Sequence, residues 1–252
     1  MQVLTLEQMF EDAKSKTQSH PSDIRYRSAL WQIFAARGEF DRARKQLDLM
    51  VQLDSTWAME VEACHGLLAA EERRLSVLRG EVIPTCLGEP PPWFASQVAA
   101  LPHLAEGRTS AALALLKSVI EAVEVRSGSM NKQSFAWLCD GDARLGPCLE
   151  VIAQGRYLWV PWGVVRSLTC RPPTEIRDRM WQHALLEVTD EGAVEVFIPV
   201  RYPEALNDEQ RLSRSTEWEA LDEELYLGRG QKTLLTDTSE AGYLDIRELC
   251  FH

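Results

Sequence analysis

The chain has 252 residues, of which 45% are hydrophobic and 26% charged, a composition typical of a globular protein with a buried core. Its 38 acidic and 27 basic residues leave a formal net charge of −11. This balance disfavours nucleic acid as a partner, because binding to a phosphate backbone requires clustered Lys and Arg. The length allows one large domain or two small ones.

The sequence contains no recognisable targeting or membrane segment. Its first ten residues lack the basic start and the apolar run of a signal peptide, and no apolar run approaches the ~20 residues that span a bilayer. The six cysteines form no CxxC pattern and no Cys/His pair with zinc-ligand spacing. We therefore expect a cytoplasmic protein with reduced thiols.

Residues 1–126 are predicted to form a tetratricopeptide-like domain of paired helices. Thr5 is a favourable N-cap, and apolar residues recur with helical spacing from Leu6 to Ala13. Residues 24–54 have the pattern of a tetratricopeptide-type hairpin, with Gly38 at the turn. Further helices are expected over residues 57–79, 93–105 and 110–125. Five or six such helices would stack into a small curved solenoid.

Two segments are rich in turn-forming residues. The first, 83–92, contains four prolines in the run IPTCLGEPPP and is expected to be an ordered loop laid over the helices. The second, 126–133, is polar and is expected to be the joint between the helical domain and a small, strand-rich α+β domain over residues 134–252.

The stretch from residue 135 to residue 162 changes its period. The spacing of Leu149, Ile152 and Ala153 predicts a helical segment, which Gly155 would end. Residues 157–162 then alternate like a buried, extended segment.

The remaining chain is predicted to be mainly strands. A hairpin is expected from residues 181–189 and 193–200, across the turn residues Asp190-Glu191-Gly192. The other expected elements are a strand over 164–170, a loop and helix with a solvated acidic face over 207–227, and strands over 231–236 and 243–249.

Few residues suggest catalytic chemistry. Asp140 and Asp142 lack the further oxygen ligands of a calcium loop, and His183 has no nucleophile motif beside it. Gly228-Arg229-Gly230 does not open a helix, so we expect no nucleotide-binding loop. We predict no catalytic residue, no metal site and no cofactor. The alternative is a small hydrolase or metal-dependent enzyme in the second domain that uses Asp140, Asp142 and His183.

The helical half suggests a binding function. A helical solenoid presents a concave face, and large aromatic residues are favoured anchors for a bound peptide or helix. The candidate partner-binding residues are Trp31, Phe34, Trp57 and Trp93. Core packing explains each of them individually as well or better. A third hypothesis is a structural oligomer that associates through its aromatic surface.

Several sequence runs, which together extend over essentially the whole chain, resemble one bacterial family. The longest is FAWLCDGDARLGPCLEVIAQGRYLWVPW, residues 135–162. The others lie at residues 40–53, 87–93 (LGEPPPW), 197–203 (FIPVRYP), 216–218 (TEW) and 244–248 (LDIRE). This combination is similar to the ImpE/TagJ family, also called SciE, of accessory proteins in bacterial type VI secretion.

The resemblance implies a non-enzymatic adaptor in the cytoplasm of a Gram-negative bacterium, with a tetratricopeptide-like first half and a smaller second domain. It implies binding to the N-terminal helix of the small contractile-sheath subunit, and an indirect link to the ATPase that recycles the sheath. It implies no catalytic residue and no membrane insertion. The glycine-rich stretch that usually precedes the family signature is replaced here by residues 127–131, SGSMN.

Overall fold

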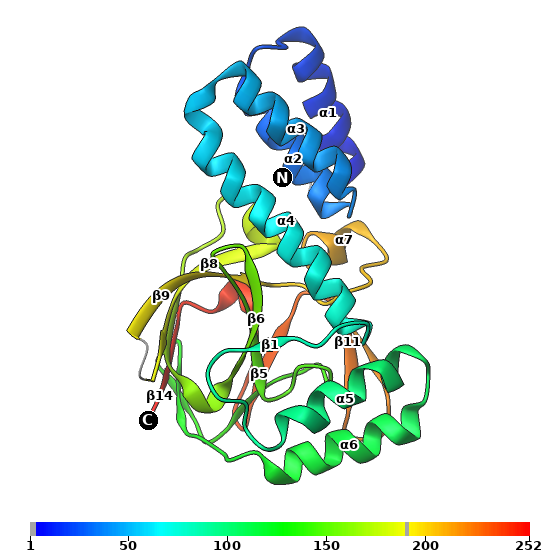
Figure 1. Ribbon diagram of the computed structural model, residues 1–252, viewed down its shortest axis with the longest axis vertical. Helices are drawn as coiled ribbons and strands as arrows, with labels where there is room; N and C mark the ends of the chain where they lie inside the picture. Colours follow the sequence, from blue (N-terminus) through cyan, green and yellow to red (C-terminus); the bar gives the residue numbers. More distant parts are fainter. Residues whose placement is uncertain (1–3, 190–191) are drawn as a thin grey trace.

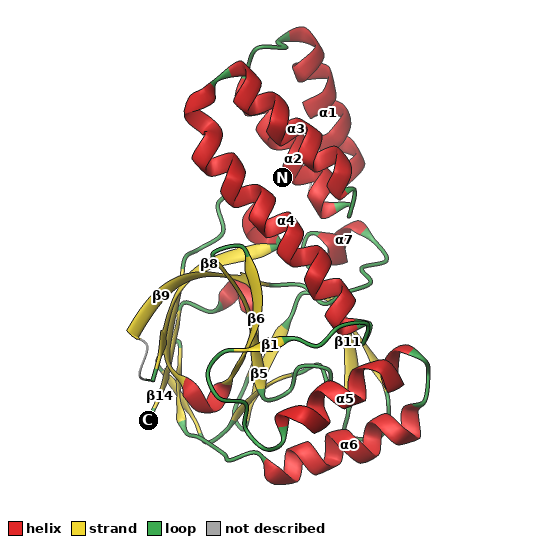
Figure 2. Cartoon of the chain, in the orientation of Figure 1, coloured by secondary structure: helices red, strands yellow, loops and turns green. Residues whose placement is uncertain are grey.

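The computed structural model describes residues 4–189 and 192–252. Four helices pack together at one end of the molecule, and the strand-rich part lies at the other (Figures 1 and 2). These helices are α1 (Leu6–Ser19), α2 (Ile24–Ala36), α3 (Phe40–Leu53) and α4 (Ala58–Leu78), with the 3₁₀ helix η1 (Ser55–Trp57) before α4. The predicted fold class, a helical region followed by a strand-rich domain, is confirmed.

Local signals explain where these helices begin and end. The Thr5 hydroxyl accepts a hydrogen bond from the Gln8 N–H at 3.1 Å, and the Gln8 side chain accepts one from the Thr5 N–H at 3.0 Å. This reciprocal capping box starts α1. Asp23 caps α2 by accepting from the Arg25 N–H at 3.0 Å. Between α2 and α3, Gly38 adopts a φ of 77°, which glycine reaches without strain.

A nine-stranded sheet, of strand order β1-β6-β5-β9-β8-β7-β14-β2-β3, forms the centre of the second part. Its strands are β1 (Thr85–Cys86), β2 (Gly128–Met130), β3 (Gln133–Phe135), β5 (Cys148–Ala153), β6 (Arg156–Pro161), β7 (Val165–Cys170), β8 (Trp181–Val188), β9 (Gly192–Pro199) and β14 (Glu248–Phe251). Two smaller sheets, β10-β11 and β13-β12-β4, comprise β4 (Leu138–Asp140), β10 (Thr216–Ala220), β11 (Tyr226–Gly230), β12 (Thr233–Thr236) and β13 (Glu240–Gly242). Short helices complete the chain: α7 (Asp208–Arg211), η2 (Trp162–Val164), η3 (Arg177–Arg179) and η4 (Tyr243–Asp245).

The last helical pair, α5 (Phe94–Ala105) and α6 (Thr109–Ala122), leaves the helical stack. The expectation that it would extend a solenoid is wrong, because the pair lies beside the strand-rich part (Figure 1). Segment 83–92 causes the change: β1 within it pairs in parallel with β6 and extends the edge of the sheet. Gln97 then anchors α5 by donating to two backbone carbonyls of the loop after β4, at 2.9 and 2.8 Å.

The strand predictions hold in part. The hairpin of β8 and β9 is confirmed, with Leu186 opposite Val194; its turn residues Asp190 and Glu191 lie outside the described residues. The helix expected around Leu149–Ala153 is wrong, because these residues form β5 between β6 and β9. A strand covered on both faces is a nearly continuous apolar run, and such a run does not distinguish strand from helix.

Two further segments differ from expectation. The polar segment 126–133 contains β2, which pairs with β14 and β3 in the large sheet. Segment 207–227 contains only the single-turn helix α7, followed by the β10-β11 hairpin. The ring of Tyr202 packs on Gly228 of this hairpin so closely that an added Cβ would lie 2.2 Å from it. Long-range packing therefore determines the structure of both segments.

Candidate functional site

A cluster of buried charges lies where α4 meets the strands. Arg74 of α4 donates to both carboxylate oxygens of Glu150 on β5, at 2.8 and 3.1 Å. Lys232 donates to Glu150 at 2.8 Å and lies 3.4 Å from Asp140 on β4. Glu71, one turn before Arg74, accepts from it at 3.2 Å. All five residues are at most 3% exposed, so water screens these pairs very little.

Aromatic donors satisfy the remaining acceptors of this cluster. The Tyr157 hydroxyl donates a hydrogen bond to Glu150. The hydroxyls of Tyr202 and Tyr243 donate to Asp140. The indole of Trp181 on β8 donates to Glu71 at 2.9 Å. Each of the three carboxylates therefore has at least two donors, as buried charges require.

The surroundings shift the pKa values of two of these carboxyl groups in opposite directions. Burial raises the pKa of Asp140 to about 6, and the charge of Lys232 opposes this only in part. Burial alone would also raise the pKa of Glu150, but the charges of Arg74 and Lys232 outweigh it and lower that pKa to about 2. Glu150 is thus the negative centre of the cluster, whereas burial makes ionisation of Asp140 less favourable than in water.

The raised pKa of Asp140 predicts a pH effect on stability. Because folded Asp140 binds its proton more tightly than the unfolded chain does, its contribution to stability increases as pH falls from 7 toward its ordinary pKa of 3.8. The contribution of Glu150 to the stability of the fold is lost only as pH falls below its ordinary pKa of 4.5. We expect wild type to gain about 2 kcal/mol relative to Asp140→Asn between pH 7 and pH 4.5. Urea unfolding at the two pH values measures this, and an unchanged difference would contradict it.

Other polar contacts fasten the helices to the strand-rich part. The buried guanidinium of Arg201 donates to the last carbonyl of α2, that of Ala36, at 3.0 Å, where it faces the negative end of the helix dipole. The carboxylate of Asp208 accepts from the Leu6 N–H, at the start of α1, at 2.8 Å. Together with the buried charges, these contacts form a structural joint.

The structure does not bring the three enzyme candidates together. Asp142 is fully buried, pairs with Arg144, and accepts from the Gly228 N–H at 2.7 Å. His183 lies on β8 with its ring 5.2 Å from that of Phe197, and among the described residues it shares no hydrogen-bond partner with Asp140 or Asp142. Among the described residues, no group of three or more His, Cys, Asp or Glu side chains is arranged to hold a metal ion.

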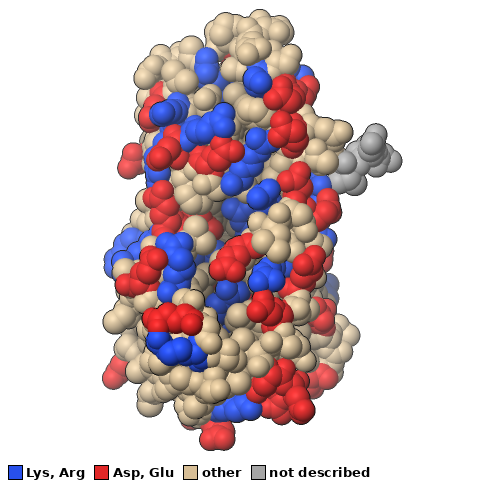
Figure 3. Space-filling view, turned by 90° about the vertical axis from the view of Figure 1, so that its right-hand side faces the viewer, with Lys and Arg blue, Asp and Glu red and all other residues tan. Residues whose placement is uncertain are grey.

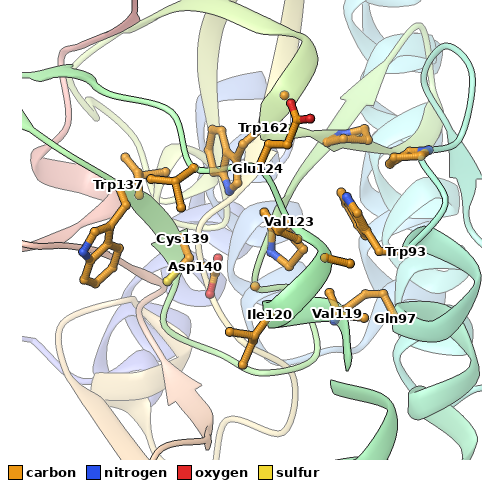
Figure 4. Close-up of a pocket in the computed structure, with 18 of the residues that line it drawn as sticks. Trp93, Gln97, Val119, Ile120, Val123, Glu124, Trp137, Cys139, Asp140 and Trp162 are labelled. Carbon is orange, nitrogen blue, oxygen red and sulfur yellow. The ribbon is translucent and has the colours of Figure 1, made fainter. Parts of the chain in front are cut away.

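An apolar groove lies between the α5-α6 pair and β4. We call it the α6 groove; it has a volume of about 790 Å³. Residues that line it include Trp93, Leu116, Ile120, Val123, Trp137 and Trp162, most of which are labelled in Figure 4. Ile120 is 57% exposed and Trp137 is 39% exposed, so large apolar side chains face solvent here. An open apolar surface of this kind is typical of a binding site.

The rim of the α6 groove is acidic. Exposed carboxylates of Glu89, Glu124 and Glu224 line it, and no ion pair joins any of the three to another described residue. The one basic residue of the lining, Arg126, turns inward, donating to three backbone carbonyls at 3.1, 2.8 and 2.9 Å and lying over the ring of Phe251. The groove therefore presents unpaired negative charge around an apolar floor.

The structure distributes the four predicted binding residues over three places. Trp31 and Phe34 are 2% and 4% exposed in the helical core, so they do not line a groove. Both lie in the last half of α2, where residues 30–36 are all buried. Trp57, in η1 directly before α4, is 37% exposed and does not line the α6 groove. Trp93 alone lines the α6 groove. The aromatic residues that sequence reasoning missed there, Trp137 and Trp162, belong to the 135–162 run.

The surface charge and the apolarity of the helices are relevant to two other kinds of partner, nucleic acid and membrane. Acidic and basic side chains are interspersed on the face shown in Figure 3, without a continuous basic patch. Within residues 4–189 and 192–252, no helix has both the length and the apolarity to cross a membrane.

Comparison with known proteins identifies the family. The family profile described as ImpE protein matches residues 132–250. The type VI secretion system accessory component TagJ of Pseudomonas aeruginosa is 36% identical over 249 residues, which are 98% of this chain and 87% of that protein. The chain belongs to the ImpE/TagJ family. The crystal structure of a Vibrio parahaemolyticus protein, 24% identical, has the same fold with a TM-score of 0.90, covering 98% of this ImpE/TagJ chain and 94% of the Vibrio chain.

Proposed function

We propose that this chain is a non-enzymatic accessory component of a bacterial type VI secretion system that acts in the cytoplasm. The P. aeruginosa relative, which has that accessory role in its name, supports the setting. We further propose that the chain binds the N-terminal helix of the small contractile-sheath subunit, and so links it to sheath assembly or to ATPase-driven recycling. The resemblance noted in the sequence supplies this partner.

The observation that carries the proposal is the α6 groove, with its open apolar walls. Helix recognition commonly places the apolar face of an amphipathic helix into such a groove. The walls come from the predicted helical domain, 1–126, and from the predicted α+β domain, 134–252. We propose that the two domains form the binding surface jointly, because removing either would leave the groove with one wall.

Calorimetric titration of the full chain with a peptide of the cognate sheath subunit's N-terminal helix tests the proposal. We expect saturable one-to-one binding. We expect Trp93→Ala and Ile120→Glu each to weaken it at least about tenfold, since one removes an aromatic anchor and the other places a charge on the apolar floor.

Matched controls lie on the helical stack. Trp57→Ala and Met59→Glu make the same two changes at exposed positions outside the α6 groove, and we expect wild-type affinity from both. Loss of binding in the controls with retention in the groove variants would move the site to the α3-α4 end. No binding of the peptide by wild type would refute the sheath-helix proposal.

A further inference from the structure

The α6 groove combines two features that together specify the chemistry of its occupant. Its floor is apolar, and Ile120 and Trp137 are open to solvent. Its rim carries the carboxylates of Glu89, Glu124 and Glu224. Two acidic residues of the adjoining segments are paired within the chain: Asp222 with Lys117 at 2.7 Å, and Glu219 with Arg229 at 2.6 Å. The rim carboxylates have no such partner among the described residues.

We infer that the α6 groove takes a basic amphipathic helix. The apolar stripe of that helix packs on Trp93, Ile120 and Trp137. Lys or Arg residues that flank the stripe pair with the three rim carboxylates. Opposite charge on the two surfaces speeds encounter and rejects acidic helices of equal apolarity. The inference rests on the proposed function for the identity of the partner, and it adds the charge by which the partner is chosen.

A second observation at the groove concerns Trp162. Its side chain is only 5% exposed, it lines the groove, and its indole N–H has no hydrogen-bond partner among the described residues (Figure 4). An unpaired buried donor is unfavourable and favours a ligand that brings an acceptor. The last four carbonyls of a helix have no partner within the helix, so the C-terminal end of the bound helix provides one.

This arrangement gives the bound helix a direction. Its C-terminal turn lies at Trp162, where basic residues also suit the negative end of the helix dipole and the nearby Glu124. A carboxylate is a poor alternative acceptor, because Glu124 would repel it. The indole nitrogen is buried, so this hydrogen bond requires the surrounding groups to move when the helix binds.

Charge exchange tests the inference with the full chain. The probes are the sheath-helix peptide and two designed helical peptides of matched length, one of Leu and Lys and one of Leu and Glu. We expect the double variant Glu89→Lys with Glu124→Lys to bind the sheath peptide and the Leu/Lys peptide about tenfold or more weakly than wild type does. Raising the salt concentration from about 0.05 to about 0.5 M should weaken the binding of both peptides to wild type by a similar factor. We expect no binding of the Leu/Glu peptide. Glu62→Lys with Glu240→Lys, which changes the net charge equally at exposed sites outside the groove, should leave affinity unchanged.

A spectroscopic measurement tests the Trp162 contact separately. In isotope-labelled protein, the indole N–H resonance of Trp162, assigned through Trp162→Phe, should move downfield when peptide binds. A stationary resonance would overturn the proposed direction of the helix.

The outcomes separate this inference from the proposed function. If the affinity for the sheath peptide changes neither with salt nor with the charge exchange, the inference is overturned and the proposed function stands. Charge-dependent binding of the Leu/Lys peptide without binding of the sheath peptide supports the groove chemistry and refutes the proposed partner. Binding of neither peptide overturns both.

Discussion

Replacing Glu150 with glutamine is expected to lower the free energy of unfolding by about 3–5 kcal/mol, the usual effect of breaking a buried ion pair. The substitution preserves shape but removes the negative charge nearest to Arg74 and to Lys232, both of which are fully buried. These cations would remain desolvated, with only Glu71 at 3.2 Å and Asp140 at 3.4 Å to balance them. Equilibrium urea unfolding at pH 7 measures the change.

An exposed pair provides the control for Glu150. Glu195 lies 3.2 Å from Arg171, and both side chains are about two-thirds exposed. Solvent screens this pair, so Glu195→Gln should change stability by less than about 1 kcal/mol. Equal losses in the two variants would show that burial of the cluster does not set its strength.

Replacing Gly230 with alanine is expected to cost about 2–5 kcal/mol. Its φ of 91° lies in the left-handed region, which disfavours a side chain by about 1–2 kcal/mol. In addition, the new Cβ would lie 2.1 Å from the backbone oxygen of Ser215, so the backbone must shift. That oxygen accepts from the Gln231 N–H at 2.8 Å, and the shift would therefore disturb the residue next to Lys232.

Gly107 separates the two contributions. It has a similar φ of 70°, but nothing lies within 4 Å of an added Cβ. Gly107→Ala should therefore show the conformational cost alone, about 1–2 kcal/mol by urea unfolding. If both variants lose the same amount, the contact with Ser215 has no energetic consequence and the argument for Gly230 fails.

The candidate site could be predicted from the sequence only in small part. Trp93 was singled out as a binding residue and lines the α6 groove, whereas Trp31 and Phe34 have the same chemistry and are core residues. Helical spacing shows which residues share a face of α2 but not which neighbour covers that face. The groove itself combines residues 89–126 with residues 137–164 and beyond. No local pattern reports that pairing.

The amino-acid sequence by itself determined the features that depend on near neighbours. The capping box at Thr5, the turn at Gly38 and the alternation in β8 and β9 all act over a few residues, and each predicted its element correctly. The residues and the order of the quoted runs also sufficed to indicate the family. The helical first region and the strand-rich second region follow from these local signals.

Only the tertiary structure decided where those elements go. The pairing of β1 with β6 carries α5 and α6 away from the helical stack and creates the α6 groove, and the bond between Arg74 and Glu150 joins residues 76 positions apart. Residues 149–153 become a strand because β6 and β9 pair with its two edges and the assembled fold buries nearly all of its side chains. Such long-range contacts gain their free energy from burial and charge pairing in the assembled fold, which no short stretch of sequence contains.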